Sequence, residues 1–230
     1  MDRPLPDDNI AKLRLRIRLS AEKYHRPESS ILLLAVSKTR PPEDIRRAHD
    51  CGLSDFGESY LQEAVDKIES LADLPLTWHF IGPIQSNKTR PIAEHFDWVH
   101  SVDRLKIARR LDEQRPPSSP PLQVCIQVNI SGEASKSGAD PAAVRELAQA
   151  INGMPRLQLR GLMAIPAATQ DEQAQRTAFA RLRELLESLR GEFPTMDTLS
   201  MGMSGDLEAA IAEGSTIIRI GTALFGPRDG

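Results

Sequence analysis

The sequence predicts a (β/α)8 TIM barrel, because short apolar runs of β type alternate with helical patterns along most of its 230 residues. Eight such runs occur, and a helical pattern follows each of the first seven. Strands that alternate with helices form parallel βαβ units, and eight units of this size are typical of a closed barrel. The alternative is an open doubly wound sheet, but no GxGxxG motif follows the first strand.

A leading helix is predicted before the barrel, over residues 7–24. Apolar residues recur there at steps of three and four, so they share one face. We therefore expect a single domain over 1–230, with a leading helix and linker over 1–27 and the barrel over 28–230. The residues on the shared face are Ile10, Leu13, Ile17, Ala21 and Tyr24.

Glycine and proline set several boundaries of the barrel elements. Pro42 opens the helix after the first strand, Gly52 closes it, and Gly153 ends a later helix. A loop rich in Pro and Ser over 115–121 separates the fourth unit from the fifth. The predicted strands are 31–37, 55–58, 77–82, 98–102, 124–129, 157–165, 198–203 and 216–223. The predicted helices between them are 41–48, 59–71, 87–95, 104–114, 141–152, 171–189 and 206–213.

Composition excludes several classes of protein. The 29 basic residues nearly balance the 32 acidic ones, and aromatics are only 4%, so a nucleic-acid binder is disfavoured. The longest apolar run, 31–36, is far too short to cross a membrane, and the N-terminus does not resemble a signal peptide. Cys51 and Cys125 are typical of reduced core thiols. We expect a cytoplasmic protein, and a closed barrel without free strand edges favours a monomer or weak dimer.

Lys38 is the first candidate functional residue, since active sites of barrels lie at the C-terminal ends of the strands. It closes the first strand on the face shared by Leu34 and Val36. A lysine at this place often just marks where the strand meets water. A partly desolvated lysine over the barrel mouth has a lowered pKa and can form a Schiff base.

The last two strands add an anion site and a cation. Ser204 is the predicted N-cap of the helix at 206–213, and Gly205 follows it, although a plain helix cap is the simpler interpretation. Gly221 and Thr222 follow the eighth strand, and loops after strands seven and eight of barrels frequently hold phosphate. Arg219 lies between isoleucines on an inward face of the eighth strand, where a charge needs a partner. That partner is either a ligand at the mouth or a carboxylate of a neighbouring strand, in a structural ion pair.

A phosphate site, an amine and a fixed cation at one barrel mouth match the needs of pyridoxal phosphate (PLP). The sequence resembles the YggS/PROSC family of pyridoxal phosphate homeostasis proteins, and the matching segments span nearly the whole chain in order. These segments are 35–39 (AVSKT), 56–58 (FGE), 79–82 (HFIG), 85–88 (QSNK), 128–138, 161–163 (GLM), 200–204 (SMGMS) and 219–226 (RIGTALFG).

The resemblance implies a barrel like the N-terminal domain of alanine racemase, with PLP held as a Schiff base on Lys38. It implies that the phosphate is surrounded by two short segments and that the pyridine nitrogen lies near Arg219. The phosphate residues are Ser204, Gly205, Gly221 and Thr222. Ser59 stands where the family usually has Asn; its hydroxyl can still donate a hydrogen bond but reaches less far than an amide. His79 and Met203 complete the candidate cofactor contacts, although His79 is also a candidate for the core.

A racemase needs a second acid or base opposite Lys38, and the related enzymes take a tyrosine from an additional β-domain. The chain ends at Gly230, so we expect no such domain; Tyr60 is the tyrosine that could approach the mouth. A cation at Arg219 opposes protonation of the pyridine and so weakens carbanion chemistry. We therefore expect a PLP-binding homeostasis protein that delivers PLP to apo-enzymes and affects amino-acid metabolism indirectly.

A weak PLP-dependent amino-acid racemase is the alternative function. A third reading, an interaction module acting through the basic leading helix, gains little support from the sequence. Lys88 and Lys136 are exposed-loop lysines that could transiently carry PLP during transfer, although such lysines are normally just solvated. The histidines show no metal-ligand spacing, so no metal is expected.

Overall fold

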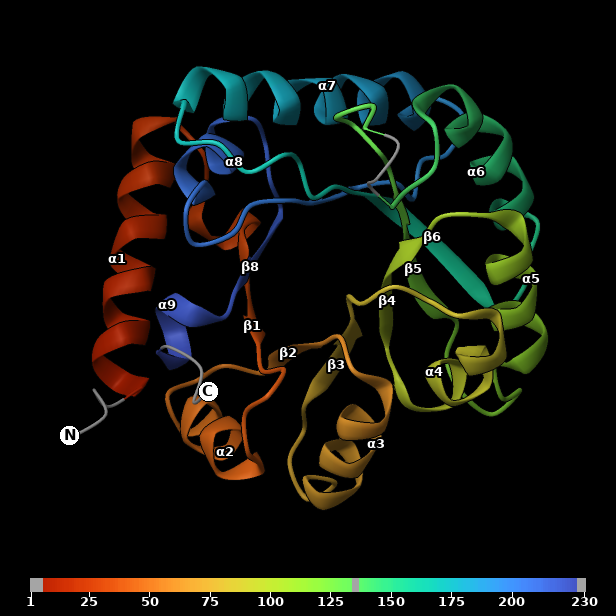
Figure 1. Ribbon diagram of the computed structural model, residues 1–230, viewed down its shortest axis with the longest axis horizontal. Coiled ribbons are helices and arrows are strands. Elements are labelled where there is room, and N and C mark those ends of the chain that lie inside the picture. Colours follow the sequence, from red (N-terminus) through yellow and green to blue (C-terminus); the bar gives the residue numbers. More distant parts are fainter. Residues whose placement is uncertain (1–5, 134–136, 227–230) are drawn as a thin grey trace.

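Eight parallel strands close into a barrel in the computed structural model, which describes residues 6–133 and 137–226 (Figure 1). Each strand pairs with its neighbours in sequence, and β1 also pairs with β8, so the predicted fold class is confirmed. The strands are β1 Leu32–Val36, β2 Asp55–Glu58, β3 Thr77–Phe80, β4 Trp98–Val102, β5 Leu122–Gln127, β6 Leu157–Met163, β7 Thr198–Ser200 and β8 Ile217–Ile220.

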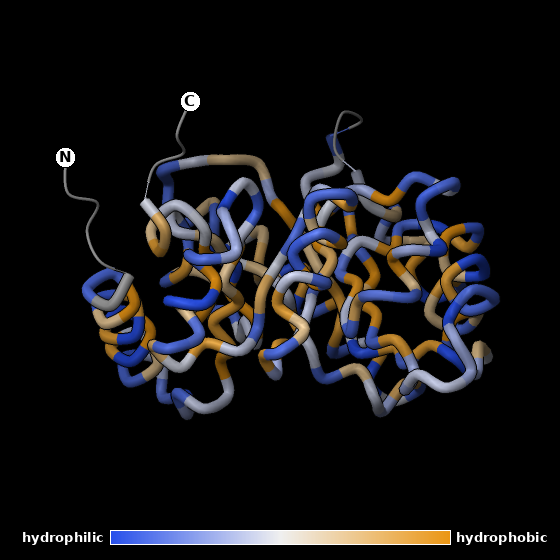
Figure 2. Tube along the Cα trace, turned by 90° about the horizontal axis from the view of Figure 1, so that it is seen from below, coloured by the Kyte–Doolittle hydropathy of each residue, from blue (hydrophilic) through white to orange (hydrophobic). Residues whose placement is uncertain are grey.

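Helices surround the strands and turn their apolar residues toward the interior of the molecule. In α5, for example, Ile107, Ala108 and Leu111 are fully buried at helical spacing. Hydrophobic residues gather between the helices and the barrel, and hydrophilic residues face outward (Figure 2). The helices are α1 Pro6–Lys23, α2 Pro42–Asp50, α3 Leu61–Ser70, α4 Thr89–His95, α5 Leu105–Gln114, α6 Val144–Asn152, α7 Glu172–Arg190, α8 Leu207–Ala212 and α9 Thr222–Phe225. Short 3-10 helices are η1 Glu28–Ser30, η2 Ser86–Lys88 and η3 Pro141–Ala143.

The leading helix α1 lies beside α8 and α9 on the outside of the barrel (Figure 1). Its predicted apolar face is almost entirely buried, at 3% exposure or less for Ile10, Leu13, Ile17 and Ala21. Arg16 pairs with Glu208 of α8 at 2.7 Å and donates to the Ser204 carbonyl at 3.3 Å. The helix α1 therefore packs against the elements that follow β7 and β8 and is bonded to them.

The chain leaves the barrel earlier than predicted after both final strands. β7 ends at Ser200 rather than 203, and β8 ends at Ile220 rather than 223, where the short helix α9 begins. Gly202 has a φ of +99°, and an added Cβ there would lie 2.6 Å from the Ala210 Cβ, so only glycine fits this turn. The prediction that Ser204 caps the next helix was wrong, because α8 begins at Leu207.

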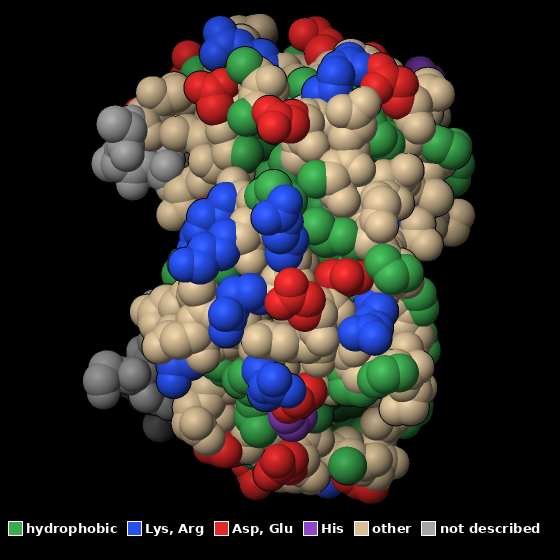
Figure 3. Space-filling view, turned by 90° about the vertical axis from the view of Figure 1, so that its right-hand side faces the viewer, with side chains coloured by type: hydrophobic (Ala, Val, Ile, Leu, Met, Phe, Trp, Pro, Cys, Tyr) green, Lys and Arg blue, Asp and Glu red, His purple; other side chains and the backbone are tan. Residues whose placement is uncertain are grey.

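The surface over α5 and α6 mixes the two signs of charge. Asp and Glu side chains stand among the Lys and Arg side chains on this face (Figure 3).

None of the helices in 6–133 and 137–226 combines the length and apolarity that spanning a membrane requires.

Candidate functional site

Lys38 lines a cavity of about 830 Å³ at the C-terminal end of the barrel. It is half-buried and comes directly after β1, while the loops after the next strands supply most of the other walls. Ser59 and Tyr60 follow β2, and Ile165 follows β6. The sequence-based expectation that Tyr60 approaches the mouth is met, since it lines the same cavity and is 51% exposed.

The loops after β2 and β3 approach each other closely at this cavity. An added Cβ on Gly82 would lie 2.3 Å from the Ser59 carbonyl oxygen, so a side chain at position 82 would push the two loops apart. Lys88, an alternative amine, is exposed and lines the same cavity. Lys136 lies outside the described residues.

β8 lies directly against the strand that carries Lys38. Leu34 pairs with Arg219, and an added Cβ on Gly221 would lie 3.3 Å from the Val36 carbonyl oxygen. The close backbone approach expected at Gly221 is therefore present, and it brings the end of β8 beside the end of β1.

The predicted phosphate residues lie in two adjoining loops. Residues 203–205 follow β7, and Gly221 and Thr222 follow β8; the Arg219 N–H donates to the Gly202 carbonyl at 2.9 Å and joins the two segments. Met203, Gly205 and Thr222 are exposed. None of these loop residues borders the 830 Å³ cavity, so within the described chain the loops and the Lys38 cavity are separate parts of the mouth.

Arg219 is a buried cation held by neutral groups. It is 4% exposed, and its guanidinium donates to Ser200 Oγ at 2.7 Å and to the Ala164 carbonyl at 2.9 Å. It forms no ion pair with any described residue, so the structural ion pair considered from the sequence is not what holds it. Burial lowers the pKa of Arg219 to about 10, with the charge of Asp206 opposing this shift, so the side chain stays protonated at pH 7.

A chain of hydrogen bonds runs from Arg219 across the interior of the barrel to Asp55. Ser200 Oγ lies 2.7 Å from His100 Nδ1, and His100 Nε2 lies 2.9 Å from His79 Nδ1. His79 Nε2 then lies 3.1 Å from Asp55 Oδ1. The five side chains come from five strands, so the chain crosses the whole interior.

Donor counting fixes the direction of every bond in this chain. The Asp55 carboxylate can only accept, so His79 donates to it from Nε2, and a neutral His79 then has Nδ1 as an acceptor. His100 therefore donates from Nε2 to His79 Nδ1, and its own Nδ1 accepts from the Ser200 hydroxyl, whose oxygen accepts from Arg219. Burial lowers the pKa values of His79 and, more strongly, His100, so both stay neutral.

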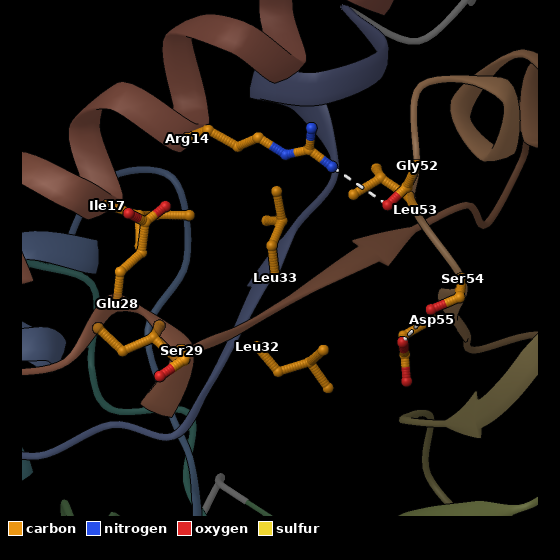
Figure 4. A pocket seen from close by; sticks show the side chains of 11 residues that line it. Arg14, Ile17, Glu28, Ser29, Leu32, Leu33, Gly52, Leu53, Ser54 and Asp55 are labelled. Atoms are coloured by element: carbon orange, nitrogen blue, oxygen red, sulfur yellow. Dashed lines mark hydrogen bonds between the residues drawn. The ribbon is translucent and has the colours of Figure 1, made fainter.

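Asp55 is the anionic end of this chain. Burial raises the pKa of its carboxyl, but hydrogen bonds from His79 and Ser54 outweigh that effect and lower it overall. Asp55 opens β2 and therefore lies at the end of the barrel opposite the mouth, where it borders a cavity of about 550 Å³ (Figure 4). His79, a candidate cofactor contact, is fully buried and is connected to Arg219 through His100 and Ser200.

Sequence reasoning missed His100, Ser200 and Asp55. Inward positions on strands could have flagged them, because polar residues on an inward face need partners. It also missed Lys67 on α3, which is 4% exposed and forms an ion pair with Glu58. Glu58 lies in β2, the neighbour of the strand that precedes Lys38. The signal available for that lysine was its place on the apolar face of a helix.

The model of the alanine racemase N-terminal domain family matches residues 9–229, which cover all eight strands of the barrel. The chain belongs to the family of pyridoxal phosphate homeostasis proteins. It is 65% identical to the protein of that name from Pseudomonas aeruginosa, over 96% of this chain and 95% of the relative. The Escherichia coli protein of the same name is 53% identical, with 96% of each chain covered.

Solved structures give the same picture. PipY of Synechococcus elongatus, a structure with PLP bound, is 39% identical and has a TM-score of 0.84, covering 96% of this chain and all of its own. Alanine racemase from Corynebacterium glutamicum has a TM-score of 0.67 at 19% identity over 61% of its length, which shows a shared fold.

Proposed function

We propose that this chain binds PLP at the barrel mouth, holds it on Lys38 and serves intracellular PLP homeostasis. The observation that carries this proposal is the pairing of β1 with β8, which sets the cavity-lining Lys38 beside the strand of the buried cation Arg219. The names of the relatives and the PLP in the PipY structure support it.

The residues present fit the chemistry of PLP. Bound PLP supplies an aldehyde that an amine can take up with loss of water, and Lys38 is the cavity-lining amine closest in sequence to a strand end. Arg219 would face the pyridine nitrogen as a donor, and the loops at 203–205 and 221–222 would surround the phosphate. Ser59, which lines the Lys38 cavity, would contact the cofactor with a shorter side chain than the Asn usual in the family.

Arg219 supports binding rather than catalysis. A guanidinium that stays protonated opposes a second proton on the pyridine nitrogen, and an unprotonated pyridine is a poor sink for a carbanion. The chain would therefore hold PLP and pass it to apo-enzymes, with indirect effects on amino-acid pools. The specific observation that favours the alternative, a weak amino-acid racemase, is that Tyr60 lines the Lys38 cavity.

Absorption spectroscopy tests the binding proposal. The protein loaded with PLP should be yellow, and borohydride should fix the cofactor to the peptide that contains Lys38. A Lys88→Ala variant should behave like wild type, whereas Lys38→Ala should stay colourless. A wild-type protein that gains no visible absorption with PLP would refute the proposal.

Two further assays separate a carrier from a racemase. Incubation of the loaded protein with an apo-enzyme that needs PLP should restore that enzyme's activity, which supports delivery. Incubation with L-amino acids should leave their enantiomer composition unchanged. Rapid racemisation that is lost in Tyr60→Phe would establish the alternative function instead.

We also propose that residues 1–230 act as one PLP-binding domain in the cytoplasm, as a monomer or weak dimer. Cys125, a fully buried thiol in no disulfide, supports a reducing compartment. Light scattering across a range of protein concentrations measures the oligomeric state directly, and a tight dimer or larger assembly would contradict it.

A further inference from the structure

The turn that carries Lys38 holds a residue in an unfavourable backbone conformation. Thr39 has a φ of +65°, in the left-handed region that branched residues avoid. The Arg40 N–H donates to the Ser37 carbonyl at 3.0 Å, so Lys38 and Thr39 are the two central residues of a tight turn. In a turn of this kind the second central position normally takes glycine. Such strain persists only where the surroundings enforce it, and it gathers at functional sites.

Two side chains of α3 hold the backbone on either side of Lys38. Glu63 Oε1 accepts from the Thr39 N–H at 2.5 Å, and Lys67 Nζ donates to the Ser37 carbonyl at 2.8 Å. Glu63 and Lys67 are one helical turn apart and pair with each other at 2.5 Å. The helix thus contacts the residue before Lys38 and the residue after it.

Lys67 itself is anchored by a buried carboxylate. Its Nζ also donates to Glu58 Oε1 at 2.8 Å, and Glu58 accepts from the Ser37 hydroxyl at 2.7 Å. Glu58 is fully buried, and burial raises the pKa of its carboxyl against the opposing charge of Lys67. The three protons of Lys67 are used by Ser37, Glu58 and Glu63, so this lysine is committed to holding the turn.

We infer that Glu63 and Lys67 are positioning residues that keep the Lys38 turn in its left-handed conformation and so direct Lys38 into the cavity. This inference rests on the proposed function, because it assigns the purpose of the strain to PLP retention on Lys38. Without the Glu63 bond, Thr39 relaxes toward negative φ. The peptide that carries Lys38 then rotates, and PLP dissociates faster.

Glu63→Ala tests this inference, with Glu69→Ala as the matched control on the exposed face of the same helix. The readout is the rate at which PLP-loaded protein loses its visible absorption after removal of free PLP. Loss of a hydrogen bond to a charged group should raise that rate about tenfold in Glu63→Ala. Glu69→Ala should match wild type, and the inference is overturned when the two variants release PLP at the same rate.

Thr39→Gly separates positioning from a general loss of stability. Glycine adopts positive φ without strain, so Glu63→Ala should speed release less than about twofold in the Thr39→Gly background. An undiminished tenfold effect there would reject the inference, because general destabilisation does not depend on the residue at position 39. The Tm of the PLP-free protein should follow the same pattern of coupling.

Lys67 variants complete the test. Lys67→Met leaves Glu58 buried without its cation and is expected to fold poorly, so Lys67→Arg, which keeps the charge, should restore slow release. A wild-type protein without a PLP band would refute the proposed function, whereas the Tm coupling between Glu63 and Thr39 would still decide the role of the turn.

Discussion

Ser200 joins Arg219 to the rest of the interior polar chain, so Ser200→Ala is the sharpest perturbation of it. Ser200 Oγ accepts from Arg219 and donates to His100, both at 2.7 Å. Alanine removes two buried hydrogen bonds, one to a charged group, and leaves a guanidinium N–H and an imidazole nitrogen unpaired. The expected cost is roughly 2–4 kcal/mol in the free energy of unfolding.

Urea unfolding and thermal unfolding measure this cost. For a domain of this size each kcal/mol shifts Tm by about 2–4 °C, so we expect a fall of roughly 5–15 °C. Ser188→Ala is the control, because Ser188 is exposed on α7 and its hydroxyl bonds to the Leu185 carbonyl. That variant should change the free energy of unfolding by less than about 0.5 kcal/mol.

The directed chain also specifies the tautomer of each histidine. Nitrogen NMR of the wild-type protein should show His79 and His100 neutral with the proton on Nε2. Ser200→Ala should shift the His100 signals and leave the pattern at His79 nearer to wild type. A stability change below about 0.5 kcal/mol in Ser200→Ala, or a proton on Nδ1 of His100 in wild type, would refute the reasoning.

Three other outcomes are expected. Lys38→Ala should abolish the visible absorption of bound PLP while changing Tm little. Retained absorption would show that another amine binds PLP. The free energy of unfolding should fall as the pH drops below 6.5, because His100 becomes protonated in the unfolded chain but not in the native state, where its pKa is lowered. His100→Gln should reduce this dependence of stability on pH. An unchanged dependence in that variant would contradict the reasoning. Arg16→Ala should speed PLP loss, because Arg16 binds Glu208 and the Ser204 carbonyl; the matched Arg18→Ala, on an exposed part of α1, should have no such effect.

The barrel could be predicted from the sequence because its signal is local. Each strand is a short apolar run, and helix boundaries carry their own residues, such as Pro42 and Gly52. Local signals failed at the ends of β7 and β8, where the apolar residues of 222–225 resemble a strand but form α9. A helix of four residues is too short to show a periodic pattern.

The candidate site could be predicted only in part, for a different reason. Lys38 and Arg219 stand out because each interrupts or ends an apolar strand. His100, Ser200 and Asp55 are ordinary in their local context, and their roles come from strand register, which brings side chains far apart in sequence together. His79 was a candidate for the cofactor site or the core; it is fully buried, and the partners it finds there depend on that same register.

Among the described residues, the hydrogen bonds that hold the turn of Lys38 and those that hold the Arg219 guanidinium share no residue. The chain from Arg219 runs through neutral, buried groups to Asp55, so the arginine is fixed by the same contacts that fill the barrel. The turn of Lys38 is held from α3, and its contact to Thr39 comes from Glu63, whose side chain is 30% exposed. Under the proposed function, this division lets the attachment at the lysine loosen without disturbing the interior. The exposed bond at Thr39, rather than the buried chain, is therefore where release would begin.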